Sequence, residues 1–130
     1  MSRYLLDTHV ALWWAEDSPK LSERHRAIIE DADVEIILSV ATVWEASIKS
    51  ALGRLPLPRE PLQFFQHLVD RDGFTVLPVH LSHAAGVFNL PHVHADPFDR
   101  LLIVQARSEG LVVLSNDAIF ASYDLPGLVR

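Results

Sequence analysis

The stretch "VEIILSVATVWEASIKSAL", residues 34–52, decides the fold class. Its first six residues form a short segment rich in apolar, β-branched side chains, which is typical of a buried strand. From residue 40 the apolar side chains recur at positions 40, 43, 44, 48, 51 and 52, which is helical spacing, and Gly53 favours the end of the helix. A buried strand that leads into an amphipathic helix is typical of a parallel α/β fold.

The same alternation runs through the rest of the chain. Short apolar runs predict further strands over residues 3–7 and 74–79, and a strand followed by a turn over 111–117. Helical spacing, together with capping and breaking residues, predicts helices over residues 8–16, 21–32 (with Ser22 as N-cap), 61–72, 81–90 and 97–110, and a last helical turn over 118–124. Because the strands lack polar alternation, both faces of the sheet are expected to be covered. We therefore predict one α/β domain over residues 1–130, a three-layer α/β/α sandwich with a central parallel sheet of four or five strands.

The composition of the chain excludes several classes of protein and of site. With 130 residues, 49% of them apolar, the chain fits one domain of ordinary size. The absence of cysteine excludes a disulfide scaffold, a cysteine zinc site and a thiol nucleophile, and it suits the cytoplasm. We see neither an apolar run long enough to span a membrane nor a signal peptide. The net charge of -6 argues against binding nucleic acid unless a local basic patch or bound cations offset it.

Acidic residues follow or precede the predicted strands. Asp7 ends the first strand, Glu45 lies in the second turn of the helix after residues 34–39, and Asp117 follows the last strand by two positions. Asp96 and Asp99 open the helix before that strand. Each acid alone has a structural explanation as a cap, a turn residue or a solvated helix residue. Together they are expected to converge where parallel sheets bind ligands, at the carboxyl ends of the strands.

Converging carboxylates repel one another unless a cation lies among them. Because all the proposed ligands are oxygens, the expected ion is Mg²⁺ or Mn²⁺. Such an ion can polarise a phosphate and activate water for an in-line displacement.

The motif "HADPFDR", residues 94–100, suggests different roles for its two aspartates. Proline suits the first position of a helix, so Pro97 makes Asp96 the expected N-cap. Asp99 then stands at the third helical position, from which its carboxylate can reach the cleft. We therefore assign Asp99 to chemistry and Asp96 mainly to structure.

Four segments carry a family resemblance: "LLDTHVALWW" (5–14), "WEASIK" (44–49), "DPFDRLLIVQA" (96–106) and "VLSND" (113–117). In this order they resemble the PIN-domain ribonucleases, and specifically the VapC-type toxins of bacterial type II toxin–antitoxin pairs. The resemblance implies a Mg²⁺- or Mn²⁺-dependent endoribonuclease that forms a homodimer and has a cognate antitoxin. The residues that it implies as metal-binding and catalytic acids are Asp7, Glu45, Asp99 and Asp117. The residues expected to support them are Thr8, Ser39, Asp96, Arg100, Ser115 (in a position where this family often has threonine) and Asn116.

Two other functions remain open. A phospho-acceptor receiver domain would need a lysine late in the chain, but the only lysines are Lys20 and Lys49. A catalytically silent binding module is disfavoured by the intact acids at all four positions.

Several side chains have roles that the sequence does not separate. Arg100 could contact phosphate or pair with an acid. The histidine pairs His80/His83 and His92/His94 suit loop packing or substrate contact better than zinc. A basic rim could be formed by Arg3, Lys49, Arg54 and Arg100. A hydrophobic groove for an antitoxin segment could be lined by Trp13, Trp14, Leu21, Phe64 and Phe65.

Overall fold

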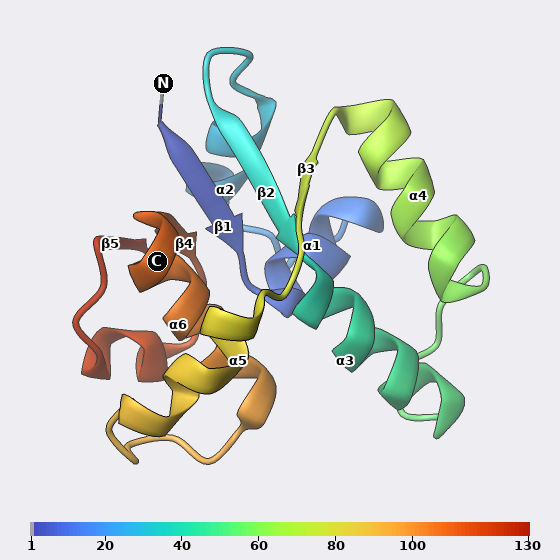
Figure 1. The fold of residues 1–130 in the computed structure, drawn as a ribbon. Helices are drawn as coiled ribbons and strands as arrows, with labels where there is room; N and C mark the ends of the chain where they lie inside the picture. The colour runs from blue at the N-terminus through green and yellow to red at the C-terminus, as the bar shows by residue number, and fades with distance from the viewer. Residues whose placement is uncertain (1) are drawn as a thin grey trace.

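Five parallel strands form one sheet in the structure, a computed structural model that describes residues 2–130 (Figure 1). The strands are β1 (Arg3–Leu6), β2 (Glu35–Ser39), β3 (Thr75–Leu77), β4 (Val112–Leu114) and β5 (Gly127–Val129). The α-helices are α1 (Thr8–Ala15), α2 (Glu23–Glu30), α3 (Val40–Ala51), α4 (Pro61–Asp72), α5 (Leu81–Gly86) and α6 (Pro97–Glu109). Two short 3₁₀ helices are η1 (Val87–Asn89) and η2 (Ala118–Ser122).

The order of the strands locates the ligand-binding edge. From β1 the chain moves outward through β2 to β3, and it then returns to the other side of β1 for β4 and β5. Leu5 of β1 therefore pairs with Ile37 on one side and with Val113 on the other. In open parallel sheets, ligands bind outside the carboxyl ends of the strands, at the point where the strand order reverses. Here that point lies between β1 and β4.

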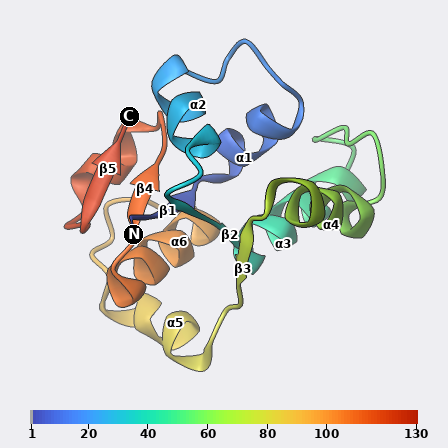
Figure 2. The ribbon, with the colours of Figure 1, turned by 90° about the horizontal axis from the view of Figure 1, so that it is seen from above.

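Helices cover both faces of the sheet (Figure 2). Neighbouring residues of a strand point to opposite faces. Leu5 accordingly belongs to the core beneath α6, with Ile103, whereas Leu6 belongs to the core beneath α1, α2 and α4, with Val10 and Phe65. All five of these side chains are buried. These two cores confirm the three-layer α/β/α sandwich.

Capping residues lie at the starts and ends of helices where the sequence predicts them. The Ser22 side chain accepts the N–H of His25 at 3.1 Å at the start of α2. Gly73 and Gly110 follow α4 and α6 with φ angles of 70° and 69°, the left-handed conformation that favours glycine.

Some elements differ from the prediction. The fifth strand, β5, is not among the predicted strands, although the predicted sheet of four or five strands allows it. The helix expected over residues 81–90 ends as α5 at Gly86 and continues as η1, and the strand expected over 74–79 shortens to Thr75–Leu77. Within residues 2–130, no helix is long and apolar enough to cross a membrane.

Candidate active site at the carboxyl end of the sheet

Asp7 lies at the point where the strand order reverses. It directly follows β1 and caps α1, and its Oδ1 accepts the N–H of His9 at 2.6 Å and that of Val10 at 3.4 Å. Its Oδ2 accepts a hydrogen bond from the hydroxyl of Ser115, which follows β4. The residue is only 6% exposed, and this burial raises the pKa of the Asp7 carboxyl more than its hydrogen bonds lower it. A nearby cation would therefore favour the ionised form.

Glu45 reaches the same region from α3. It is 3% exposed, and each of its carboxylate oxygens has a partner. The Thr8 hydroxyl donates to Oε1 at 2.6 Å, and the Lys49 ammonium donates to Oε2 at 2.6 Å. The hydrogen bond from Lys49 to Glu45 raises the pKa of Lys49, and the negative charges of Glu45, Asp96 and Asp99 raise it further. Lys49 is therefore a cation held among the acids.

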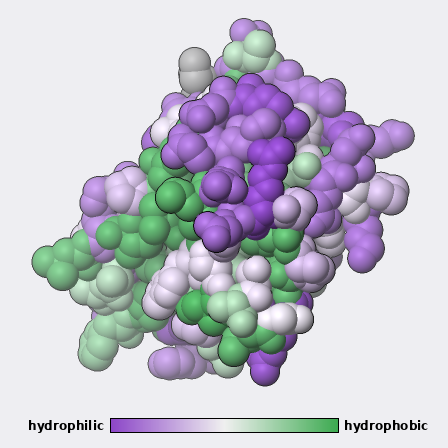
Figure 3. Space-filling view, turned by 90° about the vertical axis from the view of Figure 1, so that its right-hand side faces the viewer, coloured by the Kyte–Doolittle hydropathy of each residue, from purple (hydrophilic) through white to green (hydrophobic). Residues whose placement is uncertain are grey.

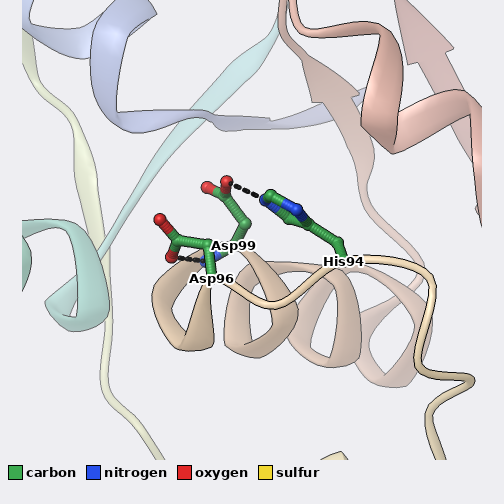
Figure 4. Close-up of side chains that lie close together, drawn as sticks. All are labelled: His94, Asp96 and Asp99. Atoms are coloured by element: carbon green, nitrogen blue, oxygen red, sulfur yellow. Dashed lines mark hydrogen bonds and ion pairs between the residues drawn. The ribbon is translucent and has the colours of Figure 1, made fainter.

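The motif at the start of α6 brings His94, Asp96 and Asp99 together (Figure 4). Asp96 is the N-cap, because its Oδ1 accepts the N–H of Phe98 at 2.9 Å and that of Asp99 at 3.1 Å, which confirms the predicted cap. His94 Nε2 lies 2.9 Å from Asp99 Oδ2. One potential ligand atom from each of His94, Asp96 and Asp99 lies within 4.8 Å of the other two.

The charges of the other acids affect the pKa of Asp99. Burial raises the pKa of its carboxyl to about 6, and the negative charges of Asp96, Asp7 and Glu45 contribute to the rise. The hydrogen bond with His94 acts in the opposite direction. Four acids from β1, α3 and the start of α6 thus influence one another through space, although they are far apart in the sequence.

The loop after β4 supplies the remaining acid. The Asp117 N–H donates to Ser115 Oγ at 3.0 Å, and the Asp117 side chain caps η2 by accepting the N–H of Ile119 at 3.0 Å. Asp117 is exposed. With Asn116 and Asp7 it lines a cavity of about 300 Å³. Asp117 therefore lies beside the buried aspartate, on the open side of the site.

Two of the expected supporting residues bind elsewhere. Ser39 is fully buried, caps α3 and donates to Gln105 Oε1, so its hydroxyl joins α3 to α6. Arg100 is also buried, and its guanidinium donates to the backbone carbonyls of Val87, Leu90, Pro91 and His94. Arg100 therefore clamps the loop before α6, and it neither pairs with an acid nor is free to bind phosphate.

The four residues of the expected basic rim, Arg3, Lys49, Arg54 and Arg100, do not form one patch beside the acids. Arg3 lies at the start of β1, away from the carboxyl end, where it contacts Glu35 and the Glu109 carbonyl. Of the four cations considered, Lys49 is the one that pairs with an acid of the site.

The aromatic residues do not line one groove. Trp13 is half-buried and lines the cavity beside Asp7. Trp14 Nε1 instead donates to Asp72 at 3.1 Å, next to Phe74. The remaining aromatic pair, Phe64 and Phe65, is packed edge to face in the core, as is Leu21. Of this set, Trp13 alone is near the acids.

Two contacts of the site were not predicted. Lys49 follows Glu45 by four positions, and this helical spacing could have indicated the pair. The partner of His94 depends on the path of the loop before α6, so no spacing rule reveals it.

The donor set fits a divalent cation. Asp7 is buried and Asp99 is half-buried, and the pKa values of both carboxyls are raised. Asp96 and His94 offer donor atoms beside Asp99. A cation would relieve the repulsion among these carboxylates. Glu45 is already paired with a cation, because its Oε2 accepts a hydrogen bond from the ammonium of Lys49.

The chain is similar in sequence to two known ribonucleases. The chain is 29% identical to ribonuclease VapC22 of Mycobacterium tuberculosis over 127 residues, which cover 97% of this chain and 95% of the relative. It is 37% identical to ribonuclease VapC16 of the same organism over 60 residues, covering 46% of this chain and 43% of that relative.

Solved structures share the fold. VapBC2 from Rickettsia felis, bound to a promoter DNA fragment, superposes with a TM-score of 0.73 at 12% identity, covering 98% of this chain and 97% of the other. FitAcB from Neisseria gonorrhoeae superposes with a TM-score of 0.62 at 20% identity, covering 98% and 96%. The family model for the PIN domain matches residues 4–125. The chain therefore belongs to the PIN domain family.

Proposed function

We propose that this protein is a Mg²⁺- or Mn²⁺-dependent endoribonuclease and the toxin of a type II toxin–antitoxin pair, acting in the cytoplasm. The observation that carries the proposal is the cluster at the start of α6, where ligand atoms of His94, Asp96 and Asp99 lie within 4.8 Å of one another. Asp7 and Glu45 are close enough that their charges add to the effect of burial on the pKa of Asp99. These acids surround the ligand-binding point of the sheet. The names of the two VapC relatives support ribonuclease activity.

Asp7 and Asp99 would hold the metal ion, with Asp96, Asp117 and Glu45 as the further acids. Bound there, a divalent cation supplies an activated water and charge stabilisation at phosphorus. The chain itself fixes the geometry. The Ser115 hydroxyl and two backbone N–H groups orient the Asp7 carboxylate. His94 orients that of Asp99.

Lys49 supplies a positive group that can contact RNA, although the acidic composition argues against nucleic-acid binding. Its side chain is 41% exposed, whereas the Glu45 side chain that it pairs with is 4% exposed. An ammonium has three donors, and Glu45 uses one of them. The others can bind a phosphate of RNA, so the site carries a positive group of its own despite the net charge of -6.

Protein partners form the second half of the proposal. VapBC2 of Rickettsia felis, which shares the fold, was solved bound to a promoter DNA fragment, and together with the resemblance to VapC-type toxins this supports an antitoxin partner here. We also propose a homodimer. Exposed apolar residues on α3 and at its C-cap, namely Trp44, Ile48 and Leu52, offer a surface for either the antitoxin or the second protomer. Figure 3 shows hydrophobic surface gathered on the lower part of the face that carries α3 and α4.

The test is cleavage of a mixed-sequence RNA by the purified chain. We expect defined cleavage products in Mg²⁺ or Mn²⁺ and none with Asp99→Asn. The matched control is Asp33→Asn, because Asp33 is exposed and precedes β2 at the opposite end of the sheet. A folded wild-type chain that binds its antitoxin but cleaves no RNA under any metal condition would identify a silent binding module instead.

A further inference from the structure

A cavity beside the acids has no role in the function described so far. It has a volume of about 300 Å³, the lower end of the usual range for ligand sites. Its walls come from α1 and from the loop after β4, and its lining residues are Asp7, His9, Val10, Trp13, Asn116 and Asp117. We propose that this cavity binds one unpaired nucleobase of the RNA, next to the phosphate that is cleaved. This inference rests on the proposed function.

An aromatic pair forms one wall. His9 and Trp13 are four positions apart on α1, so their side chains lie on the same face of the helix. Their ring centroids are 5.8 Å apart with the planes inclined at 44°. His9 is exposed and Trp13 is half-buried, so both present ring surface to the cavity that they line. Aromatic side chains that face solvent beside a nuclease site are suited to stacking on an unstacked base.

The opposite wall is polar. Asn116 and Asp117 are exposed residues of the loop after β4. An amide offers both donors and acceptors, and a carboxylate offers acceptors, which are the groups that a base edge pairs with. Val10 adds buried apolar surface between the two walls. Stacking surface facing hydrogen-bonding groups is the arrangement that a planar heterocycle with a polar edge requires.

The position favours RNA over a protein segment. Asp7 belongs to both the acid cluster and the wall of the cavity. A base in the cavity would therefore belong to a nucleotide that flanks the phosphate at the acids. A peptide segment is the alternative occupant of the cavity, and the experiment below distinguishes it from RNA.

The experiment is a double-mutant cycle between protein and RNA. The cleaved phosphate is first mapped in a mixed-sequence RNA, and oligonucleotides are then made with an abasic ribose on either side of it. Binding is measured by fluorescence anisotropy in excess EDTA, so that the intact RNA is not consumed. We expect Trp13→Ala to weaken binding of the intact RNA roughly tenfold, within the usual range for one stacked base. One abasic RNA should lose a similar factor, and the two changes together should lose little more than either alone.

Further variants exclude a folding defect. Trp13→Phe keeps a ring and should keep most of the affinity, and His9→Ala removes an exposed partner and should show the same coupling with the abasic RNA in weaker form. The matched control is Trp14→Phe, because Trp14 packs against α4 and Phe74 rather than the cavity. Melting temperatures are recorded for all variants.

Three outcomes would overturn the inference. The first is additive effects of Trp13→Ala and of every abasic position, and the second is wild-type binding of every RNA by His9→Ala. The third is weaker antitoxin binding by Trp13→Ala with RNA affinity intact. If the wild-type chain cleaves no RNA, the proposed ribonuclease is refuted instead, and the cavity is then tested by the same binding cycle on an oligonucleotide that carries one abasic ribose at each position in turn.

Discussion

Replacing Asp99 by asparagine should stabilise the metal-free protein while removing its activity. In the folded state the pKa of Asp99 is about 6, against an ordinary value of 3.8. Below pH 3.8 the carboxyl is protonated in both the folded and the unfolded chain, so it adds no penalty. As the pH rises to 6 and above, the unfolded chain ionises more readily than the folded one, and the free energy of unfolding falls.

The size of the effect follows from that difference. Each pKa unit corresponds to about 1.4 kcal/mol, so ionised Asp99 destabilises the folded chain by about 3 kcal/mol at pH 8. Asparagine has nearly the same shape, carries no charge and can still accept a hydrogen bond from His94. We therefore expect Asp99→Asn to gain about 2 kcal/mol at pH 8 and to raise the melting temperature by roughly 6 °C for a domain of this size. The gain should disappear near pH 4.

The assay is thermal unfolding in excess EDTA at pH 8 and pH 4, followed by cleavage with Mg²⁺ restored. Asp33→Asn serves as the control and should change neither the melting temperature nor the cleavage rate appreciably. A gain of equal size at both pH values would refute the electrostatic reasoning. So would a variant that melts below wild type at pH 8.

Three further substitutions test individual contacts. Asp96→Ala should lower the free energy of unfolding by about 1 kcal/mol through loss of the N-cap, and Asp96→Ser should restore most of it; equal melting temperatures for all three proteins would contradict the cap. Arg100→Met should lower the free energy of unfolding, measured in urea, by about 3 kcal/mol, because buried carbonyls lose their donor. Arg100→Lys should not restore it, because an ammonium lacks the planar fork of the guanidinium. A lysine variant as stable as wild type would rule out the clamp. Lys49→Met should weaken RNA binding and reduce the slope of log affinity against log salt concentration by about 0.7. That is the value for one phosphate contact to a single-stranded nucleic acid. An unchanged slope would show that Lys49 does not contact the RNA.

The sequence predicts the layers and most helix ends, because these depend on local signals. Pro97 and Asp96 define the start of α6 through fixed proline geometry and one side-chain cap, and Gly110 ends it in a left-handed conformation. The topology of a parallel sheet then places Asp7 and the segment after β4 at one edge.

Other features depend on contacts between distant segments. Strand β5 has three residues and too little local signal, and it forms because it pairs with β4 and because its Val129 carbonyl is 2.7 Å from Nε2 of the buried His25. Arg100 has an ordinary position in a helix, and its clamp exists because the loop over residues 87–94 folds back across it. Such roles follow from the path of the chain and not from residue spacing.

The most direct test of the central claim, that the clustered acids hold a divalent cation, is a Mn²⁺ titration followed by electron paramagnetic resonance. Wild type and Asp33→Asn should bind Mn²⁺ with the same affinity, whereas Asp7→Asn and Asp99→Asn should each bind it at least tenfold more weakly while remaining folded. Equal Mn²⁺ affinity in all four proteins would contradict the account.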